Sequence, residues 1–365
     1  MLNEPKPAAF NTLESAPENP KQAHNRTVEY SRDYLAEIVG EENRIGERMQ
    51  AGPILKLMYD TAVAVSFRHG GVRPVMYRMD RLDLVRMICH MDMVRMEGRV
   101  IEASHSSMVV EVRCYVKPPM ERELSPSHVG YFTMVGINDQ GMPVREIPPL
   151  DLDSPSGQEA ATLASHRQAQ LNERLKALEW IDETNPLRAE DVIEADHVQR
   201  YDLLAPEQTV LRLKGQLISS GNTQDRRVLA GDLLVWLDRV ATYTARQFTR
   251  NDLAVTLSVN DVVFRKPLHA TDRIELVSRV VYVRTHTLEV SIDITVHTLE
   301  GEQYNIDSVQ FFILNYHPNG TKQKITTGLE LNPEDQDALR RYLKARTRFD
   351  FWKSNPESHL SQSLD

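Results

Sequence analysis

One block of the sequence occurs twice in the chain: residues 43–60 recur, with similar sequence, as residues 222–239. An Asn precedes an Ala-Gly pair at the same spacing in both copies, as Asn43 before Ala51-Gly52 and Asn222 before Ala230-Gly231. An apolar segment that carries a carboxylate follows each pair. A repeat with such a long period indicates that one supersecondary unit has been duplicated. We therefore expect a fold of two similar halves, in which any chemistry of the block exists twice or is shared.

The second copy predicts a strand over 208–219 and then a helix over 231–248. Apolar residues recur along this helix at the spacing of one broad buried stripe: Leu233, Leu237, Val240, Ala241, Thr244 and Phe248. Four runs with strand character follow, rich in β-branched residues and punctuated by turn residues: 253–264, 272–283, 286–297 and 302–316.

The first copy has the same order of elements. Its helix is expected over roughly 53–68, and its strands are expected at 72–86, 92–103, 107–118 and 128–138. A helix followed by antiparallel strands makes an α+β unit, in which the long helix lies against one face of a curled sheet. The fold class predicted is therefore α+β, with two such units in tandem.

The remaining segments divide the chain into five parts. Residues 1–26 are expected to be a disordered tail, and 27–140 and 206–320 are the two repeated domains. Residues 141–205 begin with several prolines and continue into a helix over 159–181, so they form a structured connector. Residues 321–365 hold a terminal helix and tail, in which Asn332 is the expected N-cap, Pro333 the first helical residue and Arg348 about the last.

Composition excludes several classes of function. A formal net charge of −9 is opposite to the basic field that a general nucleic-acid surface requires. No apolar run reaches the ~20 residues of a membrane span, and the N-terminal residues lack the features of a secretion signal. The two cysteines, Cys89 and Cys114, match no metal spacing and no disulfide framework. We therefore expect a cytoplasmic protein with no metal site, no nucleic-acid partner and no membrane span.

The motifs around the second copy resemble those of a known family. The Asn, Ala-Gly and Asp238 are followed by VNDVVFRKPL and SRVVYVRTHTLEVSI, and this order is similar to that of the hotdog-fold acyl-CoA thioesterases. Tandem copies joined by a helical connector resemble the two-hotdog acyl-CoA hydrolases, and the resemblance covers about 29–140 and 206–320. The chain departs from the family pattern in having Ala-Gly for Gly-Gly, and the customary preceding His is Gln50 or Leu229. The family's F-x-x-P motif stands only in the second copy, at Phe264 and Pro267.

The resemblance implies hydrolysis of acyl-CoA to a fatty acid and CoA. It implies no cofactor, with CoA entering only as part of the substrate. It also implies a homo-oligomer, a trimer of double hotdogs. Two alternatives remain open. One is a hotdog enoyl-CoA hydratase or dehydratase, which uses a His–acid pair, and the other is a non-catalytic acyl-CoA-binding or sensor protein.

Asp238 and Asp60 are the candidate catalytic acids. Both stand among apolar residues of their helices, where a charge is costly unless it is paired or used. Burial raises the pKa of a carboxyl toward the range of a general base. Each Asp could then activate water or attack the thioester carbon directly. The alternative is an ion pair between helices, for which Lys56 stands one turn before Asp60.

Gly52 and Gly231 are the candidate oxyanion sites, because a helix that starts beside a Gly offers unpaired amides and a positive dipole end. Asn43 and Asn222 could position water or the carbonyl, although a loop Asn often bonds its own backbone. Helices of paired hotdogs pack at a shared interface, so Asn43 would serve Asp238, and Asn222 would serve Asp60. The scattered basic residues could meet a CoA phosphate, but they are interpreted as solvated surface and none is assigned to CoA binding: Arg78, Arg81, Arg86, Arg265 and Lys266.

Overall fold

The structure is a computed structural model that describes residues 25–40, 44–45, 48–84, 86–193, 198–216, 228–266 and 268–354. Two six-stranded antiparallel sheets lie side by side, and each curls around one long helix. Residues 1–24 of the expected tail lie outside the described residues, as do Asn43 and Asn222.

The first half runs from α1 to β8. Its elements are α1 (Val28–Ser31), β1 (Asp33–Ile38), β2 (Arg44–Ile45), β3 (Arg48–Met49), α2 (Ala51–Gly70), β4 (Arg73–Met79), β5 (Leu82–Asp83), β6 (Met93–Ala103), β7 (Ser107–Lys117) and β8 (Ser125–Ile137). The long strands β6, β7 and β8 form successive antiparallel hairpins.

The connector and the second half follow in the expected order. The connector contains α3 (Pro155–Glu183), α4 (Ala189–Val192) and β9 (Asp202–Leu204). The later elements are the 3₁₀ helix η2 (Pro206–Thr209), β10 (Leu211–Gln216), α5 (Ala230–Thr249), β11 (Val255–Val259), β12 (Val262–Val263), β13 (Arg273–Val283), β14 (Thr287–His297), β15 (Gln303–Leu314), β16 (Thr327–Leu329) and α6 (Gln336–Ser354). The repeat therefore yields two copies of one unit, and the predicted tandem α+β hotdog fold is confirmed.

The two sheets exchange their edge strands. The first sheet has the order β1-β6-β7-β8-β4-β12, and the second has the order β10-β13-β14-β15-β11-β5. The short strand β12 thus pairs with β4 of the other half, and β5 pairs with β11. The single strands expected over 72–86 and 253–264 are therefore wrong, because each is two strands that belong to different sheets. No alternation pattern distinguishes a break of this kind, because both pieces keep apolar residues facing a core.

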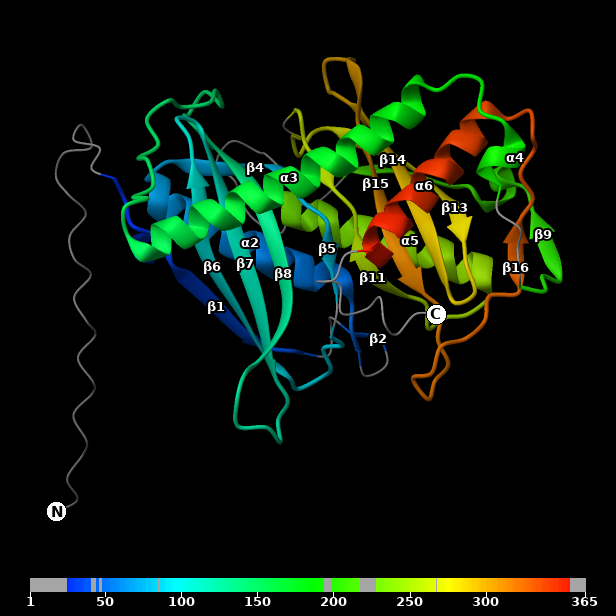
Figure 1. The fold of residues 1–365 in the computed structure, drawn as a ribbon, viewed down its shortest axis with the longest axis horizontal. Coiled ribbons are helices and arrows are strands. Elements are labelled where there is room, and N and C mark those ends of the chain that lie inside the picture. The colour runs from blue at the N-terminus through cyan, green and yellow to red at the C-terminus, as the bar shows by residue number, and fades with distance from the viewer. Residues whose placement is uncertain are drawn as a thin grey trace.

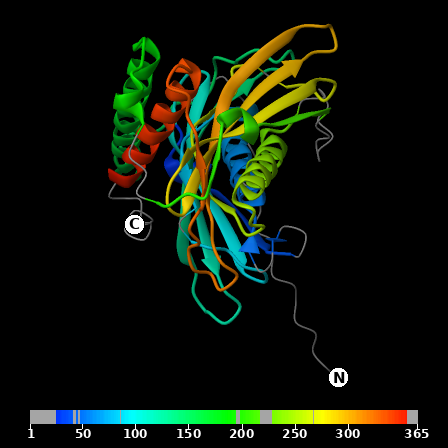
Figure 2. The same ribbon diagram turned by 90° about the vertical axis from the view of Figure 1, so that its right-hand side faces the viewer.

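The helices form layers on both faces of the sheets. In Figure 2, α2 and α5 lie together on the concave side of the sheets, and α3 and α6 lie on the outer side. The helix α3 runs across the outer side from the first half to the second (Figure 1). Among the described helices, none combines the length and the apolar character that a bilayer span requires.

Buried ion pairs fix α3 and α6 to the sheets. Arg167 of α3 donates to both carboxylate oxygens of Asp80, which follows β4, and both side chains are less than a tenth exposed. Arg174, two turns later, donates to Asp261 of the second half at 2.7 Å. Arg348 of α6 pairs with Glu289 of β14. The connector therefore holds both halves through charges that are screened little by solvent.

Two boundaries differ from the expected ones. The segment before α5 starts with η2, and its strand begins at Leu211 and not at residue 208. The final helix begins at Gln336 and not at Pro333. The Asn332 side chain accepts from the Glu334 amide in a separate turn, whereas Asp335 accepts from the amides of Asp337 and Ala338. Two capping residues stand close together in sequence, and the second one begins the helix.

Candidate active site

The helices α2 and α5 contact each other through the two repeated glycines. A Cβ built on Gly52 would lie 2.9 Å from the Val235 Cα and 3.3 Å from Asp238 Oδ2. A Cβ built on Gly231 would lie 2.7 Å from a ring carbon of Tyr59. Real Cβ atoms do not approach neighbours so closely, so both positions require Gly. The repeated glycine thus lets the start of each helix touch the middle of the other.

The Asp238 carboxylate lies at this contact and is held by both halves of the chain. The Gly52 amide of the first half donates to Asp238 Oδ2 at 2.8 Å, and the Thr256 hydroxyl on β11 donates to Oδ1 at 2.6 Å. The Asp238 residue is 1% exposed. The predicted burial of this carboxyl is therefore confirmed, and the group is composite in the sense that neither half alone supplies all of its partners.

Burial dominates the electrostatics of Asp238. Loss of solvent raises the pKa of this carboxyl above the ordinary value of 3.8, while the bonds from Thr256 and Gly52 oppose the rise. The arginines Arg246 and Arg239 lower the pKa further through their charge. A carboxylate with a raised pKa that still receives two hydrogen bonds suits the role of a general base.

A cavity of about 240 Å³ opens beside Asp238. Its lining comes from both halves and includes Gln50, Ala51, Asp238, Thr242, Thr256 and three arginines, Arg48, Arg86 and Arg246. The Arg48 guanidinium stacks on the Tyr316 ring with its carbon 3.8 Å from the ring centroid. The cavity therefore joins a buried carboxylate, the start of α2 and several cations, which is a suitable setting for an anionic substrate with a reactive carbonyl.

Sequence reasoning did not identify Thr256. A Thr in a strand is common for its β propensity alone, so nothing marks this residue within the sequence. The available signal is positional. A β-bulge interrupts the pairing of β11 with β15 just after Thr256, and an equivalent bulge interrupts the pairing of β4 with β8 just after Met76. Bulges re-aim side chains near functional sites, and this pair identifies Met76 as the counterpart of Thr256.

Asp60 does not occupy the mirror position of Asp238. Its side chain is 35% exposed and pairs with Lys56 at 3.2 Å, and Lys56 also meets Asp232 at 3.4 Å. Partial burial raises the pKa of Asp60, and the Lys56 ammonium opposes that rise. The ion pair that Lys56 offers to Asp60 is therefore present, and the catalytic role of Asp60 stays a prediction.

Tyr59 stands where the mirror carboxylate would be. It is 5% exposed and lies against Gly231. Burial raises the pKa of the Tyr59 phenol, so it stays neutral. Met76 stands at the position equivalent to Thr256. The helix contact at Gly231 and Tyr59 therefore has neither the carboxylate nor the hydroxyl found at the contact of Gly52 and Asp238.

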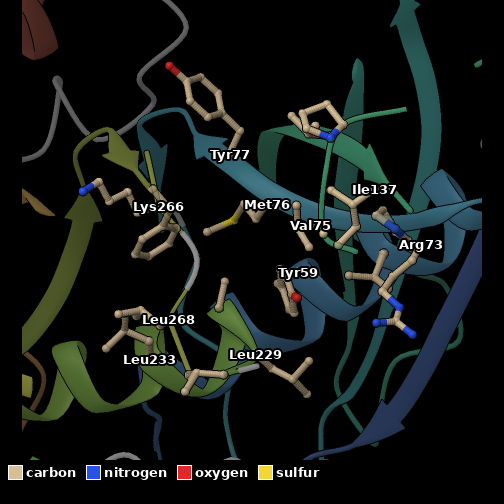
Figure 3. A pocket seen from close by; sticks show the side chains of 18 of the residues that line it. Tyr59, Arg73, Val75, Met76, Tyr77, Ile137, Leu229, Leu233, Lys266 and Leu268 are labelled. Carbon is tan, nitrogen blue, oxygen red and sulfur yellow. The ribbon is translucent and has the colours of Figure 1, made fainter. Parts of the chain in front are cut away.

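A larger cavity of about 630 Å³ opens beside Tyr59. Figure 3 shows its walls, with Leu229, Leu233 and Leu268 on one side, Val75 and Met76 on the other, and Arg73 and Lys266 at opposite sides of the view. It is built from the elements that form the Asp238 cavity, with the two halves interchanged.

The basic residues interpreted as solvated surface have different environments. Arg78 and Arg81 are largely buried, with side chains 13% and 11% exposed, and they pair with Asp80 and Asp83. That interpretation is therefore wrong for these two, because each arginine offsets a carboxylate near the exchanged strands. Arg86 lines the Asp238 cavity, and Arg265 and Lys266 line the Tyr59 cavity.

Comparison with known proteins gives a family for part of the chain. Residues 228–300 match the model of the thioesterase superfamily. No curated protein sequence matches the chain.

Several solved structures are similar to the chain. An acyl-CoA hydrolase from Bacillus cereus is 22% identical with a TM-score of 0.39, over 44% of this chain and 97% of its own. An acyl-CoA hydrolase from Agrobacterium tumefaciens is 15% identical with a TM-score of 0.29, over 80% and 96%. An acyl-ACP thioesterase from Bacteroides thetaiotaomicron is 9% identical with a TM-score of 0.47, over 78% and 98%. The resemblance to the hotdog thioesterases is confirmed: residues 228–300 match the thioesterase superfamily, and the chain folds as two hotdog domains in tandem.

Proposed function

We propose that the protein hydrolyses acyl-CoA thioesters to a free fatty acid and CoA at the cavity beside Asp238. One observation carries the proposal: the Asp238 carboxylate, 1% exposed, is held by a backbone amide from one half and a hydroxyl from the other at the edge of a cavity. The superfamily match of residues 228–300, which contain both Asp238 and Thr256, supports the same reaction.

The reaction can be written with these groups. The ionised Asp238 takes a proton from a water molecule, and the hydroxide forms a bond to the thioester carbon. Negative charge then develops on the carbonyl oxygen, near the positive end of α2, where we assign the Ala51 amide as donor because Pro53 has no N–H and Gly52 donates to Asp238. The C–S bond breaks, and the CoA sulfur receives the proton from Asp238. Direct attack by Asp238 on the same carbon would instead give a mixed anhydride, which hydroxylamine would trap.

The decisive experiment compares two carboxylates of one chain. Wild type, Asp238→Asn and Asp60→Asn are given acyl-CoAs of several chain lengths while free thiol is measured. We expect Asp238→Asn to lose about 10²–10⁴-fold in kcat, because it removes the base. Asp60→Asn should stay within about threefold of wild type, since Asp60 does not line the Asp238 cavity and pairs with Lys56.

Each outcome has a distinct meaning. Absence of thiol release by wild type from every acyl-CoA would contradict the hydrolase proposal. An equal loss in both variants would contradict the assignment to Asp238. Addition of water to an enoyl-CoA would favour the hydratase, although the described residues that line the cavity include no His for the His–acid pair of that reaction.

We also propose, from the family resemblance, that three chains associate into a trimer of double hotdogs in the cytoplasm, and that no cofactor is required. Sedimentation equilibrium of the purified protein measures the association. A mass equal to one chain at all concentrations would contradict it.

A further inference from the structure

The cavity beside Tyr59 has no part in the proposed reaction, yet it is the larger of the two. Its volume of about 630 Å³ lies within the ~300–1,000 Å³ typical of small-molecule sites. Its walls are apolar side chains from both halves, such as Val63 of α2, Val75 of β4 and Leu233 of α5. Because the cavity is open, these walls present apolar surface to solvent, which is unfavourable unless an apolar group covers it.

The charges around this cavity have one sign. Among the described residues that line it, Arg73, Arg265 and Lys266 are cationic and none is acidic. Arg265 meets Asp307 at 3.1 Å, with both side chains at least 48% exposed, so this pair is open to solvent and weakly held. The chain as a whole carries a net charge of −9, which makes a cation-only lining unusual for its surface. An apolar interior with cations around it matches an acyl chain that ends in an anionic group.

The same cavity lacks the groups that the proposed chemistry requires. Tyr59 replaces the carboxylate, and burial raises the pKa of its phenol, so the phenol stays protonated. Met76 replaces the hydroxyl of Thr256 at the equivalent bulge. A thioester placed here would meet a neutral phenol and a thioether, neither of which can remove a proton from water at neutral pH.

We propose that the Tyr59 cavity is a second, non-hydrolytic binding site for an acyl chain with an anionic head group. The acyl chain lies between β4 and the start of α5, and the head group lies by Arg265 and Lys266. A free fatty acid and an acyl-CoA share this chemistry, and either can be the source. The inference takes its ligand class from the proposed function and adds a site at which that ligand is held without being cleaved.

The test uses the full chain and two probes, dodecanoate and the non-hydrolysable thioether analogue of dodecanoyl-CoA. Calorimetry gives the affinity and the number of sites. Val63→Trp fills the cavity, and Val129→Trp is its matched control because Val129 is 42% exposed and lines neither cavity. Lys266→Glu reverses a charge at the cavity, and Lys214→Glu is its control because Lys214 is 56% exposed and lines neither cavity.

We expect Val63→Trp to remove one dodecanoate site per chain while thiol release from acyl-CoA stays within twofold of wild type. Lys266→Glu should weaken that site about tenfold or more, a change of about 1.4 kcal/mol. Neither control should alter binding. If Val63→Trp loses binding of the thioether analogue alone, acyl-CoA is the occupant. If it loses binding of both probes, the site accepts an acyl chain with either head group. Both results support the site.

Other results would overturn the proposal. Unchanged dodecanoate and thioether binding in folded, active Val63→Trp would do so, as would equal losses in Val129→Trp. Binding of CoA alone that Val63→Trp abolishes would indicate a nucleotide site without an acyl requirement. Failure of the proposed hydrolysis is read separately, from thiol release by wild type, and leaves the binding measurement valid.

Discussion

A shift of one residue separates the two carboxylates of the repeated block. Asp238 stands seven residues after Gly231, whereas Asp60 stands one position later in its copy, after Tyr59. In an α-helix one residue corresponds to a rotation of about 100°. That rotation moves Asp60 away from the position that Asp238 occupies in the contact of α2 with α5. The Asp60 side chain is 35% exposed and pairs with Lys56. One site therefore has a buried carboxylate and the other a buried phenol.

The bond from Thr256 to Asp238 should be visible in the pH dependence of the reaction. The ionised carboxylate is the active form, so activity is present above the pKa of Asp238 in the folded protein and is lost as the pH falls through it. Burial raises this pKa above 3.8, and the Thr256 hydroxyl opposes the rise. Thr256→Val should move the acidic limb of kcat upward by about one pH unit, because a hydrogen bond to a charged group contributes about 1.5–3 kcal/mol.

Thr256→Ser is the matched control, since it retains the hydroxyl and should keep the limb within about 0.3 units of wild type. A pH–rate profile of each variant gives the comparison. An acidic limb that does not move in Thr256→Val would show that this bond does not control the carboxyl.

At the scale of elements, substitution of Gly52 and of Gly231 by Ala should have different effects on activity. Gly52→Ala forces a Cβ against the Val235 backbone, where little can yield, and disturbs the amide that holds Asp238. We expect a loss of about 1–3 kcal/mol in the free energy of unfolding and a fall in kcat. In Gly231→Ala the new Cβ would press against the Tyr59 ring. We expect a similar loss in the free energy of unfolding, with kcat nearly unchanged.

Chemical denaturation and thiol release, measured on the same samples, give both quantities. Equal losses of kcat in the two variants would contradict the asymmetry of the two helix contacts. An unchanged stability in both would contradict the close approach of α2 and α5.

The connector helix depends on a buried charge pair. Removing Arg167 leaves Asp80 buried with one fewer partner, and breaking such a pair costs about 3–5 kcal/mol. Arg167→Met should therefore reduce the free energy of unfolding by that amount in urea. Lys344→Met breaks the more exposed pair between Lys344 and Asp182 and should change it by less than about 1 kcal/mol. Equal effects of the two substitutions would indicate that burial does not decide the strength of these pairs.

At the scale of the molecule, the halves are joined too closely to unfold separately. The strands β5 and β12 complete the sheet of the opposite half, α2 packs on α5, and α3 spans both. We expect one calorimetric transition, with a ratio of calorimetric to van't Hoff enthalpy near 1. Two resolved transitions, or a Gly52→Ala variant that shifts only part of the heat absorption, would show independent halves.

The duplication and the helix stripe identified most of the fold, because both depend on periodic patterns that local sequence carries. The burial of Asp238 followed from its apolar neighbours on one helix. The ends of the strands could not be predicted from the sequence. The break between β4 and β5 arises because β5 joins the second sheet, and that sheet exists only in the folded chain. The roles of Asn43 and Asn222 stay predictions, because both lie outside the described residues.

The sequence by itself determined that the chain has two hotdog units, each with a Gly at the start of its long helix and an acid within it. Tertiary structure alone decided which acid has partners across the halves, because the bonds of Asp238 to Gly52 and Thr256 join segments far apart in the chain. It also decided that the other contact encloses an apolar cavity beside Tyr59. The physical reason is that periodicity sets which face of a helix is buried, whereas the groups facing it depend on how the two halves pack.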